Sequence, residues 1–152
     1  MGTIHQIVSN PIVWCAVVAW AMAQILKIII EAIQNKSFDL SRITGTGGMP
    51  SSHSSFVTAL ATSIGIHEGF ESTYFAIAMA LAFIVMYDAQ GVRRQAGKQA
   101  AVLNMVIQML IEKEVKIERN LKELLGHTPL QVFFGAILGI LVAVVFHLLG
   151  AV

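Results

Sequence analysis

Two histidines of this sequence could take part in acid-base or nucleophilic chemistry, because each stands where a long apolar stretch begins. His53 follows Pro50 and two serines, and His127 comes directly before Thr128 and Pro129. Serine, threonine and proline are typical of the first residues of a helix. The backbone amides and the dipole at such a start favour a bound anion. We therefore expect both imidazoles to lie near positions that can hold a negatively charged group.

Phosphoryl transfer is the reaction that such a pair would suit. One imidazole can attack phosphorus to form a phosphohistidine, while the other gives its proton to the leaving alkoxide. Cationic side chains and backbone amides then hold the remaining phosphate oxygens. An unperturbed histidine titrates at about pH 6.5, so both of its protonation states are available near neutrality. The mechanism requires neither a metal ion nor an organic cofactor, and we predict none.

Each motif also has a structural interpretation. The segment GGMPSSHSS, residues 47–55, can be a serine-rich helix start with an exposed histidine. Its glycines, Gly48 among them, would also let the backbone approach an anion closely. In the second motif Thr128 and Gln131 have the spacing of a capping box, which explains Gln131 without any chemistry. The spacing alone therefore leaves helix capping and anion binding open at both histidines.

The elements that hold these residues are those of a membrane protein. The chain has 152 residues, of which 56% are hydrophobic and 12% charged, and its mean hydropathy is +0.73. Soluble domains carry about 25% charged residues, so a soluble globule, a disordered chain and a coiled coil are excluded. A disulfide scaffold is excluded because Cys15 is the one cysteine. Residues 1–26 contain no charged side chain, so the basic region of a secretory signal is absent and we expect the first helix to be retained.

We predict an all-α integral membrane protein with about four transmembrane helices and one short interfacial or cytoplasmic helix. The expected spans are residues 11–33, 52–67, 73–88 and 130–149, within a single domain. The second span is rich in Ser, Thr, Ala and Gly and is short for a crossing, so it would need protein around it. Residues 100–111 are amphipathic and would lie at the membrane surface.

Two features within these spans bear on packing. Gly135 and Gly139 form a ridge of small residues that favours the close approach of another helix. Gln24, Lys27 and Glu31 share one helical face near the inner end of the first span, where they could face protein or water. Alternatively, Lys27 could extend its ammonium group to the membrane surface with Glu31 as its partner.

All ten basic residues fall on one side of the membrane if the chain crosses it four times. The loop of residues 67–72 on the other side contains only Glu68 and Glu71 as charged residues. Lysine and arginine are enriched in cytoplasmic loops. We therefore expect both termini outside, the two histidines on the cytoplasmic side, and a location in the cell membrane. The basic residues are Lys27, Lys36, Arg42, Arg93, Arg94, Lys98, Lys113, Lys116, Arg119 and Lys122.

Three blocks of the sequence carry a resemblance to a known family. GGMPSSHSS and GHTPLQVFFGAILG, the latter at residues 126–139, resemble the second and third signature motifs of the PAP2 superfamily. That superfamily comprises the type-2 phosphatidic acid phosphatases, which are related to vanadium haloperoxidases. With IVMYDAQGVRRQAGKQAAVLN at residues 84–104 between them, the blocks look like the divergent PAP2 family of small membrane proteins. The resemblance covers residues 24–140, which is most of the chain, and it implies a PAP2-like core for the helical fold.

The resemblance implies roles for particular residues. His127 falls on the nucleophilic histidine of the third motif, and His53 falls on the acid catalyst of the second. Ser51 and Ser52 fall on the phosphate-binding part of the second motif, where Ser52 replaces a glycine. Together with the local backbone amides, and with Gly48 in support, these serines would contact the phosphate.

Three features depart from the family's pattern. Gln131 takes the place of the aspartate that orients the nucleophile, and an amide supplies no negative charge to stabilise an imidazolium. Lys36 and Arg42, the candidates for the phosphate-binding cations of the first motif, are separated by five residues rather than six, and Ile43 follows in place of proline. Leu121 stands where the third motif has an arginine.

The block at residues 84–104 could supply the cations that are missing. Arg93, Arg94 and Lys98 are the candidates for phosphate contact, and Asp88 could support them from a helix end. The same basic side chains could instead lie among anionic lipid head groups where the chain leaves the membrane. A single carboxylate is a poor metal signal, so Asp88 predicts no metal site.

The motifs predict a membrane phosphatase that hydrolyses a lipid or isoprenoid phosphate through a phosphohistidine intermediate. The alternative is a catalytically inactive PAP2-like module that binds or carries an anionic lipid, which the three departures favour. A third hypothesis, a structural subunit, is favoured by the small size and the glycine ridge. The expected partners are membrane lipids and a phosphorylated lipid or isoprenoid; a homo-oligomer is compatible with the sequence, and no nucleic acid is expected.

Overall fold

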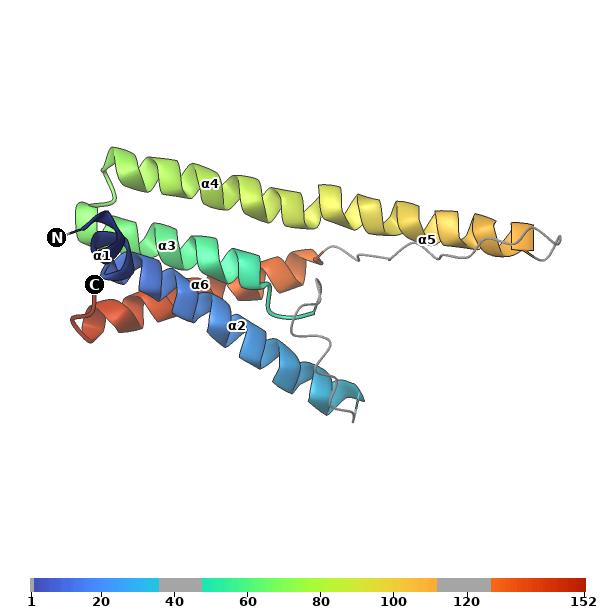
Figure 1. Ribbon diagram of the computed structural model, residues 1–152, viewed down its shortest axis with the longest axis horizontal. Coiled ribbons are helices and arrows are strands. Elements are labelled where there is room, and N and C mark those ends of the chain that lie inside the picture. The colour runs from blue at the N-terminus through green and yellow to red at the C-terminus, as the bar shows by residue number, and fades with distance from the viewer. Residues whose placement is uncertain (1, 36–47, 112–126) are drawn as a thin grey trace.

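The computed structural model describes residues 2–35, 48–111 and 127–152, and within these ranges the chain forms helices without a β-strand. Figure 1 shows how the helices are arranged. The chain is therefore an all-α protein, as the sequence predicts. In chain order the helices are α1 Thr3–Val8, α2 Pro11–Asn35, α3 Ser52–Glu68, α4 Thr73–Gln90, α5 Val92–Ile111 and α6 Pro129–Leu148.

Three helical segments of the described residues are long and apolar enough to cross a membrane, namely Pro11–Ile33, Thr73–Met109 and Pro129–Leu148. The 17-residue α3 is not among them, and it lies against α2, α4 and α6 (Figure 1). Protein thus covers much of this serine- and alanine-rich helix, as its composition requires. The bounds of α2, α3, α4 and α6 differ by no more than two residues from the expected spans. That α3 crosses the membrane stays a prediction.

The centre of the bundle consists of small side chains. Cys15 and Ala19 of α2, Ala59 of α3 and Ala143 of α6 are completely buried and form one cluster. Large apolar side chains of α4 and α6 are exposed instead, which is the distribution expected of helices that face lipid. Small residues at the contacts let the helix backbones approach closely, so packing rather than a large apolar core joins these helices.

Gly135 and Gly139 bring α6 into close contact with α3. A Cβ atom on Gly135 would lie 2.3 Å from the carbonyl oxygen of Ser51, and one on Gly139 would lie 2.1 Å from Thr58 Oγ1. Only glycine leaves room for these contacts. The Oγ1 atom of Thr58 lies 2.7 Å from the carbonyl oxygen of Ser54 and 3.1 Å from that of Ala136, so the hydroxyl bridges the two helices. The ridge that the sequence predicts therefore packs against α3.

The helix α5 continues the direction of α4 beyond the other helices (Figure 1). Hydrogen bonds pass across the junction, because the N–H of Gly91 donates to the carbonyl of Tyr87 at 2.8 Å and the N–H of Gln95 donates to the carbonyl of Gly91 at 3.0 Å. The sequence suggested a short helix over residues 100–111, whereas α5 has 20 residues because the preceding polar segment is helical too. Its position at a membrane surface stays a prediction.

The residues of the sequence motifs gather at one end of the molecule. Figure 1 shows the two chain termini near the end of α3 and the start of α4, whereas the starts of α3 and α6 lie at the opposite end of the bundle. The last turn of α4 reaches this second end, because α4 runs antiparallel to α3. The fold thus brings the second and third motifs to the same place.

Candidate active site at the starts of two helices

His53 and His127 lie beside each other at the starts of α3 and α6. Their ring centroids are 6.4 Å apart, and the ring planes are inclined by 57°. Backbone hydrogen bonds hold the elements together here: the N–H of Ser51 donates to the carbonyl of Gln131 at 3.0 Å, and the N–H of His127 donates to the carbonyl of Ala89 at 3.1 Å. The starts of α3 and α6 and the end of α4 thus form one hydrogen-bonded corner.

The imidazole of His127 is buried, with 5% of the residue exposed, and its Nδ1 atom lies 3.3 Å from Oε1 of Gln131. The backbone N–H of Thr128 donates to the same oxygen at 2.9 Å. Because an N–H group points at this atom of Gln131, the atom is the amide oxygen, and Nδ1 of His127 must be a donor as well. A neutral imidazole with its proton on Nδ1 has its lone pair on Nε2.

Gln131 consequently has two roles at once. The capping box that the sequence predicts is present, because the hydroxyl of Thr128 also accepts from the backbone N–H of Gln131 at 3.4 Å. Helix capping does not use up the side chain, since its oxygen also orients His127. The spacing of Thr128 and Gln131 predicts only the capping box. The contact between Gln131 and the imidazole of His127 is an additional one. The amide orients the ring as a carboxylate would, but it carries no charge.

His53 is exposed, whereas the serines around it are buried. Ser51 is the N-cap of α3: its Oγ accepts from the N–H of Ser54 at 3.4 Å and from the hydroxyl of Ser54 at 3.0 Å. The hydroxyl of Ser55 donates to the carbonyl of Ala19 in α2 at 3.0 Å. The helix start thus has the capping role that the sequence allowed, and it fixes the backbone that carries His53. Phosphate contact by Ser51 and the buried Ser52 stays a prediction.

The structure describes the side chain of only one of the expected phosphate-binding cations. Lys98 is exposed on α5. Arg93 and Arg94 belong to the first turn of the same helix, but their side chains lie outside the described part of the chain, and Lys36 and Arg42 lie outside it entirely. Within the described residues no group of three or more His, Cys, Asp or Glu side chains could hold a metal ion.

Lys27, to which the resemblance assigned no role, is buried at this end of α2. Lys27 is 4% exposed, and its ammonium group donates to Oε1 of Gln24 at 2.8 Å. Its aliphatic stem lies against Gly48, whose φ is +80°, and a Cβ atom there would lie 2.9 Å from Cγ of Lys27. Lys27 therefore faces protein rather than the membrane surface. The spacing of Gln24, Lys27 and Glu31 was the signal in the sequence, and it left both possibilities open.

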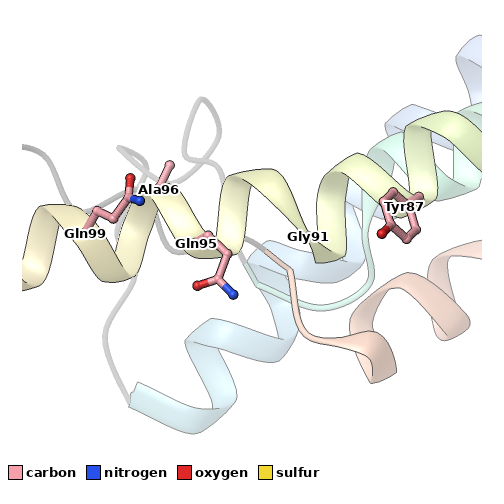
Figure 2. Close-up of a pocket in the computed structure, with 5 residues that line it drawn as sticks. All are labelled: Tyr87, Gly91, Gln95, Ala96 and Gln99. Atoms are coloured by element: carbon pink, nitrogen blue, oxygen red, sulfur yellow. The ribbon is translucent and has the colours of Figure 1, made fainter.

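A pocket of about 520 Å³ opens along α4 and α5 near the same corner. Gly91 and Gln95 are among its lining residues, whereas Asp88 is half-buried and is not. Asp88 directly precedes Ala89, whose carbonyl holds the backbone of His127. The residues that line the pocket, shown in Figure 2, are Tyr87, Gly91, Gln95, Ala96 and Gln99.

An apolar groove of about 240 Å³ lies between α2 and α6. Met49 and Pro50, which directly precede the N-cap of α3, are part of its lining, so it adjoins the loop that leads to His53. Every side chain that lines it is apolar, which would suit a hydrocarbon chain better than a polar ligand. The lining residues are Leu26, Ile30, Met49, Pro50, Phe134, Ile137, Leu138 and Leu141.

Comparison with known proteins shows the family of the chain. The model of the divergent PAP2 family matches residues 8–142. The chain belongs to the divergent PAP2 family. This divergent PAP2 protein is 40% identical, over 153 residues, to the "Uncharacterized membrane protein YuiD" of Bacillus subtilis (strain 168), which covers 92% of this chain and 96% of that protein. It is thus a membrane protein with a close relative of similar length, and no solved structure matches it.

Proposed function

We propose that this protein hydrolyses a phosphate ester of a lipid or isoprenoid, with His127 as the nucleophile and His53 as the acid. The observation that carries the proposal is the meeting of the two imidazoles, 6.4 Å apart between centroids, at the starts of two helices. In-line transfer needs a nucleophile at roughly 3 Å from phosphorus on one side and, on the other side, a proton donor at roughly 3 Å from the leaving oxygen. The two rings meet beside the starts of α3 and α6, whose dipoles favour a bound phosphate.

The reaction has two steps. In the first, the lone pair on Nε2 of His127 forms a bond to phosphorus, the bond from phosphorus to the ester oxygen breaks, and His53 gives its proton to the leaving alkoxide. In the second, His53 takes a proton from water while the water oxygen attacks phosphorus and the bond to His127 breaks. Phosphate leaves, and both imidazoles return to their initial protonation states. The contact between Nδ1 of His127 and Gln131 supports this assignment, because a neutral ring with its proton on Nδ1 has its lone pair on Nε2, the attacking atom.

The apolar groove supports a lipid or isoprenoid as the alcohol part of the ester. It lies between two helices and includes Met49 and Pro50, directly before the start of α3, so a chain bound in it could place its phosphate end at that helix start. The positive end of the helix dipole at Ser51 and Ser52 favours the phosphate there. A small water-soluble ester would gain nothing from such a groove.

The test is phosphate release from isoprenoid and phospholipid phosphates by the purified protein in detergent. We expect turnover to be lost in His127→Ala and reduced by about 10²-fold to 10⁴-fold in His53→Ala. His67→Ala is the matched control, because His67 is exposed at the far end of α3. Incubation with a labelled substrate should leave an acid-labile phosphoryl group on the unchanged protein and none on His127→Ala. Full turnover in either of the first two variants would refute the assignment of that histidine.

A module that binds a lipid phosphate without hydrolysing it is the second candidate, and the neutral Gln131 favours it. An imidazole that attacks phosphorus becomes positively charged, and the amide that contacts His127 offers no charge to stabilise it. This candidate predicts that the folded protein binds a lipid phosphate but releases no phosphate from any ester in the panel. Turnover that depends on His127 would exclude it.

A further inference from the structure

The helix α5 exposes large apolar side chains beyond the end of the bundle. Val102, Met105, Val106 and Met109 are between 46% and 60% exposed. Their spacing of three and four residues places them along one side of the helix, and together they are called the α5 apolar face. Gln108 points about 200° away from Val106 around the helix and is exposed as well. The helix therefore has an apolar side and a polar side.

The length of this helical segment shows that α5 does not share the hydrocarbon region with α4. The apolar segment Thr73–Met109 has 37 residues and is about 55 Å long, whereas the hydrocarbon region of a bilayer is about 30 Å thick. The 18 residues of α4 reach about 27 Å by themselves. Arg93, Arg94 and Lys98 follow directly, and charged side chains are costly in hydrocarbon. If α5 extended straight from α4, its apolar face would lie in water.

The α5 apolar face continues the exposed side of α4. Val102 follows Ile84 by 18 residues, and Met105 follows Tyr87 by the same number, which corresponds to about five turns of helix. Backbone hydrogen bonds with the spacing of an α-helix cross the junction, so this register is kept. Ile84 and Tyr87 are 67% and 78% exposed, as expected of side chains that face lipid. The lipid-facing side of α4 and the α5 apolar face thus lie on one side of the two helices.

The chain can change direction at Gly91, which separates the two helices. Its φ of −93° and ψ of −83° depart from the values of about −63° and −42° of an α-helix. In the structure α5 continues the direction of α4 (Figure 1). A bend of α5 away from the bundle, over the surrounding lipid, would turn the side that it shares with the exposed side of α4 down onto the bilayer. A bend in the opposite direction would turn this side to water.

The charges of α5 fit the same arrangement. The helix contains Arg93, Arg94 and Lys98 and no acidic residue. Lys98 is exposed and lies one turn before Val102. A lysine can extend its ammonium group to the head groups while apolar neighbours enter the acyl boundary. Anionic head groups attract basic side chains that lie near the membrane surface.

We propose that α5 docks on the bilayer surface through the α5 apolar face, with the bend at Gly91 and with anionic head groups as the partners of its basic residues. The occupant of this face is the lipid next to α4. Because α5 follows α4 directly, it meets that surface without a separate binding event. The proposal concerns α5 alone and does not rest on the proposed function.

The test measures the depth of two spin labels in the full-length protein, reconstituted into nanodiscs of phosphatidylcholine and phosphatidylglycerol. Val106→Cys and Gln108→Cys each carry one label in a Cys15→Ala background. Both positions are exposed, so neither label displaces a packed side chain. Collisions with oxygen report acyl chains, and collisions with a water-soluble nickel complex report water. We expect the ratio of oxygen to nickel collisions at position 106 to exceed that at position 108 by about threefold or more.

Equal ratios at the two positions would overturn the proposal, because a helix that extends straight into water exposes both labels alike. Exclusion of both reagents from position 106 would also overturn it, since protein such as a second copy of the chain would then cover the face. Nanodiscs of phosphatidylcholine alone test the role of the charges. There we expect the ratio at position 106 to fall by about half or more, and an unchanged ratio would refute the assignment of anionic lipid.

Discussion

Replacement of Gly135 by alanine tests how the helix contact positions the two histidines. The Cβ atom of Gly135→Ala would lie 2.3 Å from the carbonyl oxygen of Ser51 and 3.0 Å from Cβ of Ser54. The nearer of these atoms is backbone, which cannot rotate away as a flexible side chain could. The start of α3 and the facing turn of α6 must therefore move apart.

The size of the movement follows from the contact distance. Ordinary van der Waals contacts of a Cβ atom begin at 3.4 Å, so the backbone of Ser51 must move by about 1 Å relative to α6. Overpacking of this kind costs about 1–3 kcal/mol of stability. The same shift stretches the hydrogen bond from Ser51 to Gln131, now 3.0 Å, and moves His53 relative to His127. A displacement of about 1 Å between reacting groups can reduce a rate by about 10²-fold.

Unfolding by sodium dodecyl sulfate, followed by circular dichroism, measures the stability, and phosphate release measures the rate. Gly139→Ala is the informative comparison, because its Cβ atom would meet Thr58 and Ser55, further from the histidines. We expect both variants to be destabilised, with the larger loss of turnover in Gly135→Ala. Gly2→Ala is the control, since nothing lies within 4 Å of a Cβ atom there. Stability of Gly135→Ala equal to that of Gly2→Ala would refute the close contact from which the argument starts.

Two further predictions concern Gln131 and the orientation in the membrane. Gln131→Leu removes the oxygen that accepts from both Thr128 and His127. We therefore expect this variant to lose about 1 kcal/mol of stability and to release phosphate at least about tenfold more slowly. Gln131→Glu keeps the acceptor and adds a charge, so it should release phosphate faster than the unchanged protein. Equal rates in the two variants would mean that this contact does not orient the nucleophile. In a Cys15→Ala background, an impermeant maleimide added to intact cells should label Glu71→Cys but not Lys98→Cys, as the positive-inside rule predicts for a site on the cytoplasmic side. The opposite labelling pattern would reverse the predicted orientation.

The sequence by itself was sufficient to predict those features of the structure that depend on residues close together in the chain. The capping box of Thr128 and Gln131 could be predicted because its hydrogen bonds join residues three positions apart, a distance that helix geometry fixes. The long apolar stretches predicted the helices for a similar reason, since the backbone of a membrane protein must satisfy its hydrogen bonds within each segment. The glycine ridge also predicted a close helix contact, although the sequence did not indicate that α3 would be the partner helix.

Only the tertiary structure decided what these local features do together. The distance between His53 and His127 depends on how α3 and α6 are packed, and neither histidine's neighbours in the sequence encode that. The burial of Lys27 depends on how α2 is rotated about its axis. A shift of one residue along a helix turns the side-chain direction by about 100°, so the neighbouring position would point away from the bundle interior. The structure also shows that the oxygen of Gln131 contacts both the N–H of Thr128 and the imidazole of His127, a double contact that the spacing alone did not predict. Contacts between segments distant in the chain arise from packing, and packing is a property of the assembled helices rather than of any one motif.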